Sequence, residues 1–193
     1  MNDMARLIAM LAMCATFTAA TAADKDAWYV KAVKKLEVTI EPAQAKPGET
    51  VTLKLLVHLN EDYYTYPLKQ EDKNAAGMVN KIAFADGTGL IFVGETKDPI
   101  DYDTKAEPEL GIKEMRIYRN EVIYERKAVV SPKAKAGEIA IPLKSFRLNV
   151  CDKSNCYPTK TVMPEAKFKV LDGPAVAVAK EFQDEVRKAL EEK

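Results

Sequence analysis

The sequence predicts an all-β fold, an antiparallel β-sandwich followed by one C-terminal α-helix. Three observations support this fold class. Apolar residues alternate with polar ones in many short runs, which is the period-2 pattern of half-buried strands. Turn-forming pairs such as Pro47-Gly48 separate these runs. Helical spacing of apolar residues is found only in one terminal segment, after about seven to nine short strands, which favours an antiparallel sandwich.

The composition describes one ordinary globular domain. A chain of 193 residues is expected to form a single domain. The 29 basic and 29 acidic residues cancel, and the basic ones are dispersed along the chain, whereas a nucleic-acid-binding surface needs them clustered. We therefore expect no nucleic-acid partner. No apolar run after residue 22 reaches about 18 residues, so no membrane span is expected in the mature chain.

The first 22 residues resemble a secretory signal peptide. Arg6 closes a short N-terminal region, an apolar and small-residue run follows, and Ala20-Thr-Ala22 fits a cleavage site. Cleavage there predicts a secreted protein. The alternative, attachment of a lipid to Cys14, is disfavoured because the bulky Met13 precedes that cysteine.

Residues 23–34 form a polar N-terminal segment, expected to pack on the following domain through the pair Trp28-Tyr29. The sandwich domain is predicted over residues 35–171. Its first two strands are expected over residues 36–40 and 51–59, where apolar and polar side chains alternate.

A tyrosine-rich segment follows the second strand. Alternation places Tyr64 and Tyr66 on one face, and we interpret them as residues of the aromatic core or its rim. Short strands are expected over residues 82–84 and 90–93.

The stretch from Glu95 to Glu114 has the longest irregular pattern of the domain. A loop of this length inside a compact domain is usually functional or disordered. A pattern typical of β-strands returns over residues 115–130, with a turn predicted from Tyr118 to Glu121.

The last strands flank two cysteines. Apolar residues share one phase over residues 139–143 and the opposite phase over 146–150, so a bulge is expected near residues 142–145. If the second set points inward, pleating turns Cys151 to the other face, and its thiol is expected to be accessible. A final strand is predicted over residues 162–170.

Residues 172–193 are predicted to form the C-terminal helix, opened by Gly173-Pro174 because proline is tolerated at the first helical position. The helix carries one apolar stripe, which is expected to pack on the sandwich or on a partner. The stripe consists of Val178, Phe182, Val186 and Leu190.

Cys151 and Cys156 are the two cysteines that the mature chain keeps, and an even number in an oxidising compartment predicts one disulfide. Strand-like runs on both sides predict a β-hairpin, in which facing Cα atoms lie within bridging range. Closing such a short loop stabilises the fold by roughly 2 kcal/mol, against about 5 for a 100-residue loop. Because the bridge contributes so little to stability, the spacing leaves two interpretations, a redox-active pair and a purely structural disulfide.

A metal site is not expected. Two thiols and one distant histidine fall short of the four ligands of a structural zinc site. The Cys-x-x-Cys spacing of thioredoxin-type proteins is also absent.

Three motifs together resemble a known family. They are Tyr63-Tyr-Thr-Tyr66, Ile117-Tyr-Arg-Asn120, and Cys151-x4-Cys156-Tyr-Pro158 with Thr159-Lys-Thr-Val162 after it. In this order, over about residues 35–170, they resemble the periplasmic N-terminal domain of the thiol:disulfide interchange protein DsbD. The cysteine motif is the most specific of the three.

The resemblance implies an immunoglobulin-like sandwich that passes electrons from a membrane partner to periplasmic thioredoxin-fold proteins. Carried over by position, it implies that Cys156 forms the mixed disulfide with the partner and that Cys151 resolves it. Tyr64 and Tyr66 would lie beside the cysteines, and Tyr157-Pro158 would hold Cys156 at the mouth of the hairpin.

The chain departs from the family in two places near the site. The family's cap loop corresponds to part of residues 97–113, which are longer here, and its shielding aromatic corresponds best to Leu110, beside Glu109. Tyr-Pro-Thr also replaces the family's Tyr-Pro-Pro. A multi-span membrane domain and a C-terminal thioredoxin-like domain are not found in the sequence, so the electron donor is expected to act in trans.

The sequence therefore predicts a periplasmic thiol:disulfide interchange module that needs no cofactor and works through Cys151 and Cys156 by thiolate attack and mixed disulfides. The alternative is a redox-inert immunoglobulin-like binding module in which the same disulfide is structural.

Overall fold

The protein is described by a computed structural model that covers residues 26–192. The expected signal peptide, its cleavage site and Cys14 lie outside the described residues. The strands, in chain order, are β1 Val33–Glu41, β2 Gln44–Ala45, β3 Thr50–Leu59, β4 Tyr64–Thr65, β5 Lys81–Phe84, β6 Leu90–Lys97, β7 Asp103–Glu107, β8 Ile112–Arg119, β9 Glu121–Val130, β10 Gly137–Leu148, β11 Val150–Cys151, β12 Lys160–Val162 and β13 Glu165–Val170. The α-helices are α1 Ala27–Ala32 and α2 Gln183–Glu191, and the 3₁₀ turns are η1 Lys73–Ala75, η2 Pro108–Leu110 and η3 Lys180–Phe182.

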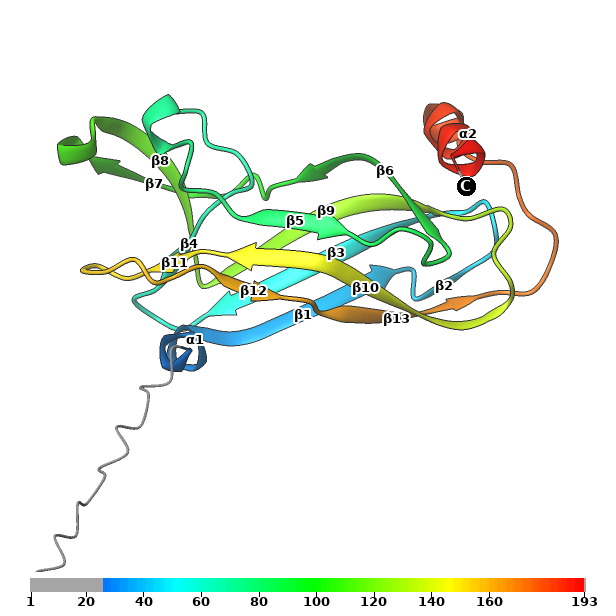
Figure 1. Ribbon diagram of the computed structural model, residues 1–193, viewed down its shortest axis with the longest axis horizontal. Helices are drawn as coiled ribbons and strands as arrows, with labels where there is room; N and C mark the ends of the chain where they lie inside the picture. Colours follow the sequence, from blue (N-terminus) through cyan, green and yellow to red (C-terminus); the bar gives the residue numbers. More distant parts are fainter. Residues whose placement is uncertain (1–25, 193) are drawn as a thin grey trace, which may run out of the picture.

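Two sheets pack face to face and form an immunoglobulin-like β-sandwich, as the sequence predicts (Figure 1). One sheet has the strand order β1-β3-β9-β6. In the other, β10 pairs with β13 and then β12 along one edge, and with β5 along the other. The register of β10 shifts between Leu143 and Ser145, which confirms the expected bulge.

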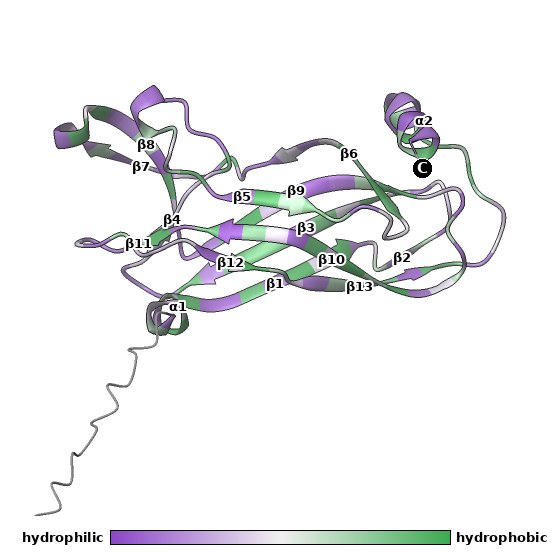
Figure 2. Ribbon diagram, viewed as in Figure 1, coloured by the Kyte–Doolittle hydropathy of each residue, from purple (hydrophilic) through white to green (hydrophobic). Residues whose placement is uncertain are grey.

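The core lies between these two sheets. Every second residue of β3 is buried, from Val51 to Leu59, because a strand that covers a core on one face alternates with period two. Phe146 and Phe168 of the facing sheet are also buried in this cluster. Figure 2 shows the resulting alternation of hydrophobic and hydrophilic bands along the strands.

A third, smaller sheet with the order β11-β4-β8-β7 extends one end of the sandwich. It carries the cysteine hairpin, and α1 lies at the same end, whereas α2 lies at the opposite end (Figure 1). Asn120 joins β8 of this sheet to β9 of the sandwich with a left-handed backbone, φ 58°. The small sheet is the element that positions the candidate site.

The prediction of one long irregular stretch from Glu95 to Glu114 is wrong. The chain forms the end of β6, then β7, η2 and the start of β8, and Gly111, with φ 67°, makes the turn between η2 and β8. β7 has no buried side chain, so its pairing with β8 depends on backbone hydrogen bonds. Strands of this kind carry no apolar alternation for a sequence pattern to detect.

The C-terminal helix is confirmed but is shorter than predicted. Helical structure begins at Lys180 instead of Gly173, because residues before it run extended and the backbone N–H of Val176 donates to the carbonyl of Pro47 over 2.8 Å. The predicted stripe does pack on the sandwich, where Phe182 and Val186 are buried against Val93 and Val129. No helix within residues 26–192 is long and apolar enough to cross a membrane.

Gly48 fixes this extended segment and gives a test of its packing. Its φ is +88°, and a Cβ atom added there would overlap the carbonyl oxygen of Val176. We expect Gly48→Ala to lower the free energy of unfolding by about 2 kcal/mol, because left-handed strain and a backbone clash act together. Chemical denaturation measures the loss. Gly77→Ala is the matched control, since that glycine has open space around it and should change stability little; equal losses in both variants would contradict the packing described.

Candidate functional site

Cys151 and Cys156 form a disulfide with an S–S distance of 2.04 Å at the tip of a short hairpin. The two residues make an antiparallel bridge, and the backbone N–H of Tyr157 donates to the carbonyl of Val150 over 3.0 Å. The predicted hairpin and the predicted bond are both confirmed.

The two sulfur-bearing residues differ in exposure. Cys151 is buried, with 1% of its surface accessible, and Cys156 is exposed. The expectation of an accessible Cys151 is therefore wrong. Alternation continues to Val150, which is buried in the main core with Phe146 and Leu148, and turns Cys151 to the other face. That face is not open, because a second buried cluster that includes Tyr66 and Met115 covers Cys151 there. An incoming thiolate would meet Cys156 first.

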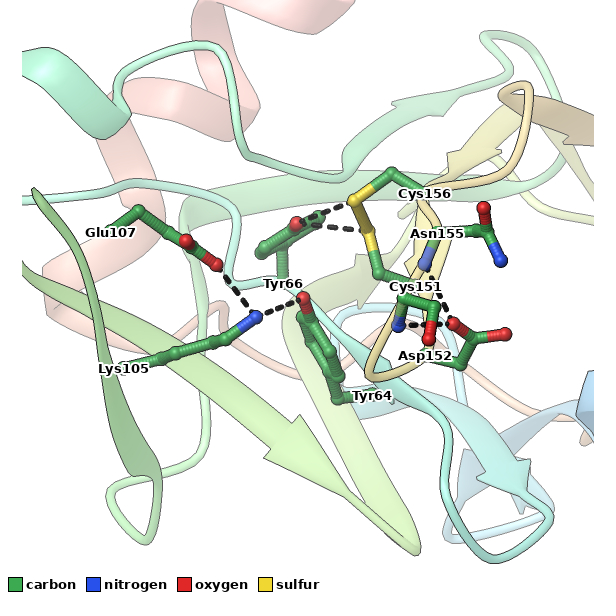
Figure 3. Close-up of polar contacts among 9 residues, drawn as sticks. Tyr64, Tyr66, Lys105, Glu107, Cys151, Asp152, Asn155 and Cys156 are labelled. Atoms are coloured by element: carbon green, nitrogen blue, oxygen red, sulfur yellow. Dashed lines mark hydrogen bonds and ion pairs between the residues drawn. A yellow bond between two sulfur atoms is a disulfide. The ribbon is translucent and has the colours of Figure 1, made fainter. Parts of the chain in front are cut away.

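Tyr66 lies against the bridge, as the resemblance implies for its position. Its hydroxyl is 3.0 Å from the Sγ atom of Cys151 and 3.6 Å from that of Cys156 (Figure 3). Since a disulfide sulfur carries no hydrogen, the Tyr66 hydroxyl is the donor to the bridge, and its one proton points to the nearer sulfur, that of Cys151. Burial raises the pKa of Tyr66 above its usual value, so the hydroxyl stays protonated at neutral pH.

Tyr64 packs edge-on against Tyr66, with ring centroids 5.8 Å apart, and is equally buried. Its hydroxyl accepts a hydrogen bond of 2.9 Å from the Nζ atom of Lys105, which also pairs with Glu107 at 2.7 Å (Figure 3). The bonds to Glu107 and then to Tyr64 raise the pKa of Lys105, so the ammonium keeps its charge. No sequence motif pointed to Lys105, because β7 shows no pattern and lies about forty residues from the tyrosines.

The predicted cap residues lie elsewhere on the same segment. Glu109 and Leu110 belong to η2, and the side chain of Leu110 is 58% exposed. Within residues 26–192, no hydrogen bond or ion pair joins either residue to a cysteine. The part of residues 97–113 that approaches the site is β7, and a cover formed by the rest of the segment stays a prediction.

The hairpin loop is held by Asp152. One carboxylate oxygen accepts the backbone N–H groups of Ser154 and Asn155, each over 2.7 Å, and the other accepts the hydroxyl of Tyr157 over 2.5 Å. The bond from Tyr157 is the largest cause that lowers the pKa of Asp152, and the same bond raises the pKa of Tyr157 to about 12.

An aromatic group lies beside Cys156. Trp28 of α1 stacks on Tyr157, with ring centroids 5.2 Å apart and an interplanar angle of 8°, and Tyr63 lies 6.1 Å from the same ring. The sequence predicted that Trp28 packs on the domain but gave no partner, since more than a hundred residues separate the two rings. Pro158 follows Tyr157 and is exposed.

A buried amide holds the segments that carry this site. The Nδ2 atom of Asn80 lies 2.8 Å from the Oγ1 atom of Thr65, the carbonyl of Tyr66 and the hydroxyl of Tyr124. Its Oδ1 atom accepts the backbone N–H of Asn149 over 2.8 Å. One side chain thus ties the tyrosine segment to the residue that leads into the cysteine hairpin.

The described residues offer no metal site. No three His, Cys, Asp or Glu side chains within residues 26–192 lie close enough together to hold an ion. The chemistry available at the hairpin is that of the sulfur atoms and of the hydroxyl groups beside them.

Replacing Asn80 tests whether this amide organises the site. We expect Asn80→Ala to lower the free energy of unfolding by about 3 kcal/mol, because it removes the bonds that join three segments and leaves the N–H of Asn149 without its partner. Urea denaturation of the oxidised protein measures it. Asn155→Ala, at an exposed position in the hairpin loop, is the matched control and should change stability by less than about 0.5 kcal/mol. A similar loss in both would show that the amide has no special role.

Asp152 gives the hairpin a pH dependence. Its folded pKa is lower than its ordinary value of 3.8, so the stabilisation is complete above that value and is lost as the pH falls through the folded pKa. Amide chemical shifts of Ser154 and Asn155, followed by NMR, should titrate below pH 3.8. Asp152→Asn keeps an acceptor without a titrating group and should flatten both curves; an inflection above the ordinary value would contradict the assignment.

Comparisons with known proteins find only limited similarity to this chain. No protein-family model matches the chain, and no curated protein matches it. Among solved structures, a chain of a type I cohesin–dockerin complex from Clostridium thermocellum has 16% identity and a TM-score of 0.38, covering 71% of this chain and 99% of that chain. A non-cellulosomal cohesin from Archaeoglobus fulgidus has 10% identity and a TM-score of 0.36, covering 72% and 92%. AvmM, which catalyses macrocyclization in alchivemycin A biosynthesis, has 14% identity and a TM-score of 0.37, covering 76% and 92%.

TM-scores this low carry no argument about function. The resemblance to the DsbD domain gains no support from these comparisons and depends on the sequence motifs alone. The fold stands on the structure itself, an immunoglobulin-like β-sandwich with one disulfide among its described residues.

Proposed function

We propose that the protein is a thiol:disulfide interchange module that exchanges electrons with partner proteins through Cys151 and Cys156. One observation carries the proposal: the bridge exposes one cysteine, Cys156, and buries the other beside a hydroxyl donor, Tyr66. A bridge attacked at its exposed residue needs a stabilised leaving sulfur on the other residue, and the hydroxyl of Tyr66 beside Cys151 supplies that stabilisation.

The exchange proceeds in two balanced steps. A thiolate of a partner dithiol attacks the Sγ atom of Cys156, the Cys151–Cys156 bond breaks, and its electron pair leaves on Cys151 as a thiolate. The partner's second thiolate then attacks the partner's first sulfur in the mixed disulfide and releases Cys156 as a thiolate. The partner dithiol is oxidised to a disulfide and this pair is reduced to a dithiol by the same two electrons; the reverse sequence reduces a partner disulfide.

The sequence motifs specify this proposal further. Their resemblance to the N-terminal domain of DsbD supports a periplasmic setting, thioredoxin-fold partners and a membrane electron donor in trans. Exchange of this kind needs no cofactor, since the electrons pass directly between sulfur atoms.

A second candidate is a redox-inert binding module with a structural disulfide. One observation favours it: Cys151 belongs to a buried cluster with Ile112, Met115 and Ile117, as a packed structural half-cystine would. The two candidate functions predict different reactivity of the remaining thiol when one of the two cysteines is replaced.

Single-cysteine variants separate the two candidates and also test the roles of the two thiols. Cys151→Ser leaves the exposed Cys156, which should trap a mixed disulfide with a thioredoxin-fold protein, because no second thiol is present to resolve it. Cys156→Ser is the matched variant and should trap little, since Cys151 is buried. Non-reducing electrophoresis with mass spectrometry of the cross-linked peptide measures both.

Equal trapping by the two variants would contradict the assigned roles. No trapping by either variant, with the fold retained, would favour the binding module.

A further inference from the structure

A line of polar groups runs from the protein surface to the buried sulfur. It begins at Lys105 on β7, whose side chain is 30% exposed, and passes through the hydroxyl of Tyr64. The ring of Tyr64 packs edge-on against the ring of Tyr66, with centroids 5.8 Å apart, and the hydroxyl of Tyr66 lies 3.0 Å from the Sγ atom of Cys151. Figure 3 shows the two tyrosines between the lysine and the bridge.

The two ends of this line fix the direction in which its protons point. An ammonium group donates and cannot accept, so the oxygen of Tyr64 is the acceptor from Lys105. A disulfide sulfur cannot donate, so Tyr66 gives its one proton to Cys151. Between the two ends, the tyrosines contact each other through their rings. Both hydrogen bonds of the line therefore donate toward the sulfur, and ring packing joins them.

This orientation matters most when the bridge is open. In the proposed exchange, Cys151 leaves as a thiolate inside a buried cluster, and burial disfavours the charged form of a thiol. A hydrogen bond that Tyr66 donates to the thiolate opposes that effect.

We propose that Lys105 is a positioning residue for exchange: it holds the hydroxyl of Tyr64, and the ring of Tyr64, packed edge-on against Tyr66, keeps the Tyr66 hydroxyl proton facing Cys151 as its sulfur becomes a thiolate. The inference rests on the proposed function and names a residue through which the protein sets the acidity of its buried thiol.

Charge alone does not account for such a role. Arg119 of β8 also lies over the ring of Tyr64, with its Cζ atom 5.4 Å from the centroid. Arg119 pairs with Asp103 at 3.3 Å, and Lys105 pairs with Glu107 at 2.7 Å, so two cations and two anions face the tyrosine from β7 and β8. The hairpin loop carries two further charged residues, Asp152 and Lys153, and Lys153 pairs with Asp62 at 3.2 Å. The distinct contribution of Lys105 is its hydrogen bond to the hydroxyl.

The test measures the Cys151 thiol directly, without a partner protein. In a Cys156→Ser background with isotopically labelled cysteine, the Cβ chemical shift of Cys151 is followed by NMR against pH, with the signal assigned by its loss in Cys151→Ser. Adding Lys105→Met should move the midpoint up by about one pH unit, which is about tenfold less thiolate at a given pH below it. Lys105→Arg keeps a donor and should restore most of the shift.

Two further variants separate orientation from bulk charge. Lys113→Met removes an exposed lysine from the same hairpin and should leave the midpoint unchanged. In a Tyr64→Phe background, Lys105→Met should have no additional effect, because the hydroxyl through which the lysine acts is gone.

An unchanged midpoint in Lys105→Met, or an equal shift with and without the Tyr64 hydroxyl, would overturn the inference. Because the titration needs no exchange partner, its result is independent of the trapping experiment. A shifted thiol with no trapping would count against the proposed function, whereas trapping with an unshifted thiol would count against Lys105 alone.

Discussion

The side chain of Asn80 is the interaction on which the rest of this site depends. It is almost fully buried, and it satisfies backbone groups of two segments that no strand pairing satisfies, the carbonyl of Tyr66 and the N–H of Asn149. Thr65 adds a second bond between the same segments, from its hydroxyl to the carbonyl of Asn149 over 2.7 Å. Leaving a buried polar group without a partner costs more free energy than one hydrogen bond contributes to stability. Separating the two segments would therefore destabilise both.

This constraint explains why a tyrosine and a cysteine far apart in sequence meet so closely. Tyr66 and Cys151 are 85 residues apart in sequence. Asn80 bonds to the backbone of Tyr66 and to the backbone of Asn149, which lies two residues before Cys151. The sandwich supplies a rigid support, since β8 runs directly into β9 and β11 follows directly from β10, and β4 pairs with both β8 and β11. The hydrophobic core thus determines where the small sheet sits, and the amide determines how the tyrosine and the sulfur face one another within it.

The sequence predicted the parts of the molecule that repeat with a regular period. The alternating runs gave β1, β3, β9 and β10 at nearly their observed positions, because each covers the core on one face. The hairpin disulfide followed from cysteine number and spacing. The sequence did not predict the exposed strand β7, which has no apolar period, or the burial of Cys151, whose face is covered by a second cluster from distant segments.

Long-range contacts were also beyond a single sequence. Nothing local to Lys105 or Trp28 marks either as a neighbour of the site, because both reach it through the packing of separate elements. The position of Trp28 has an optical consequence. It is the single tryptophan of the chain, and it stacks on the ring that follows Cys156 directly in sequence. Indole fluorescence responds to nearby sulfur and to the order of its surroundings, so the natural emission of the protein reports on the state of the hairpin without any added label.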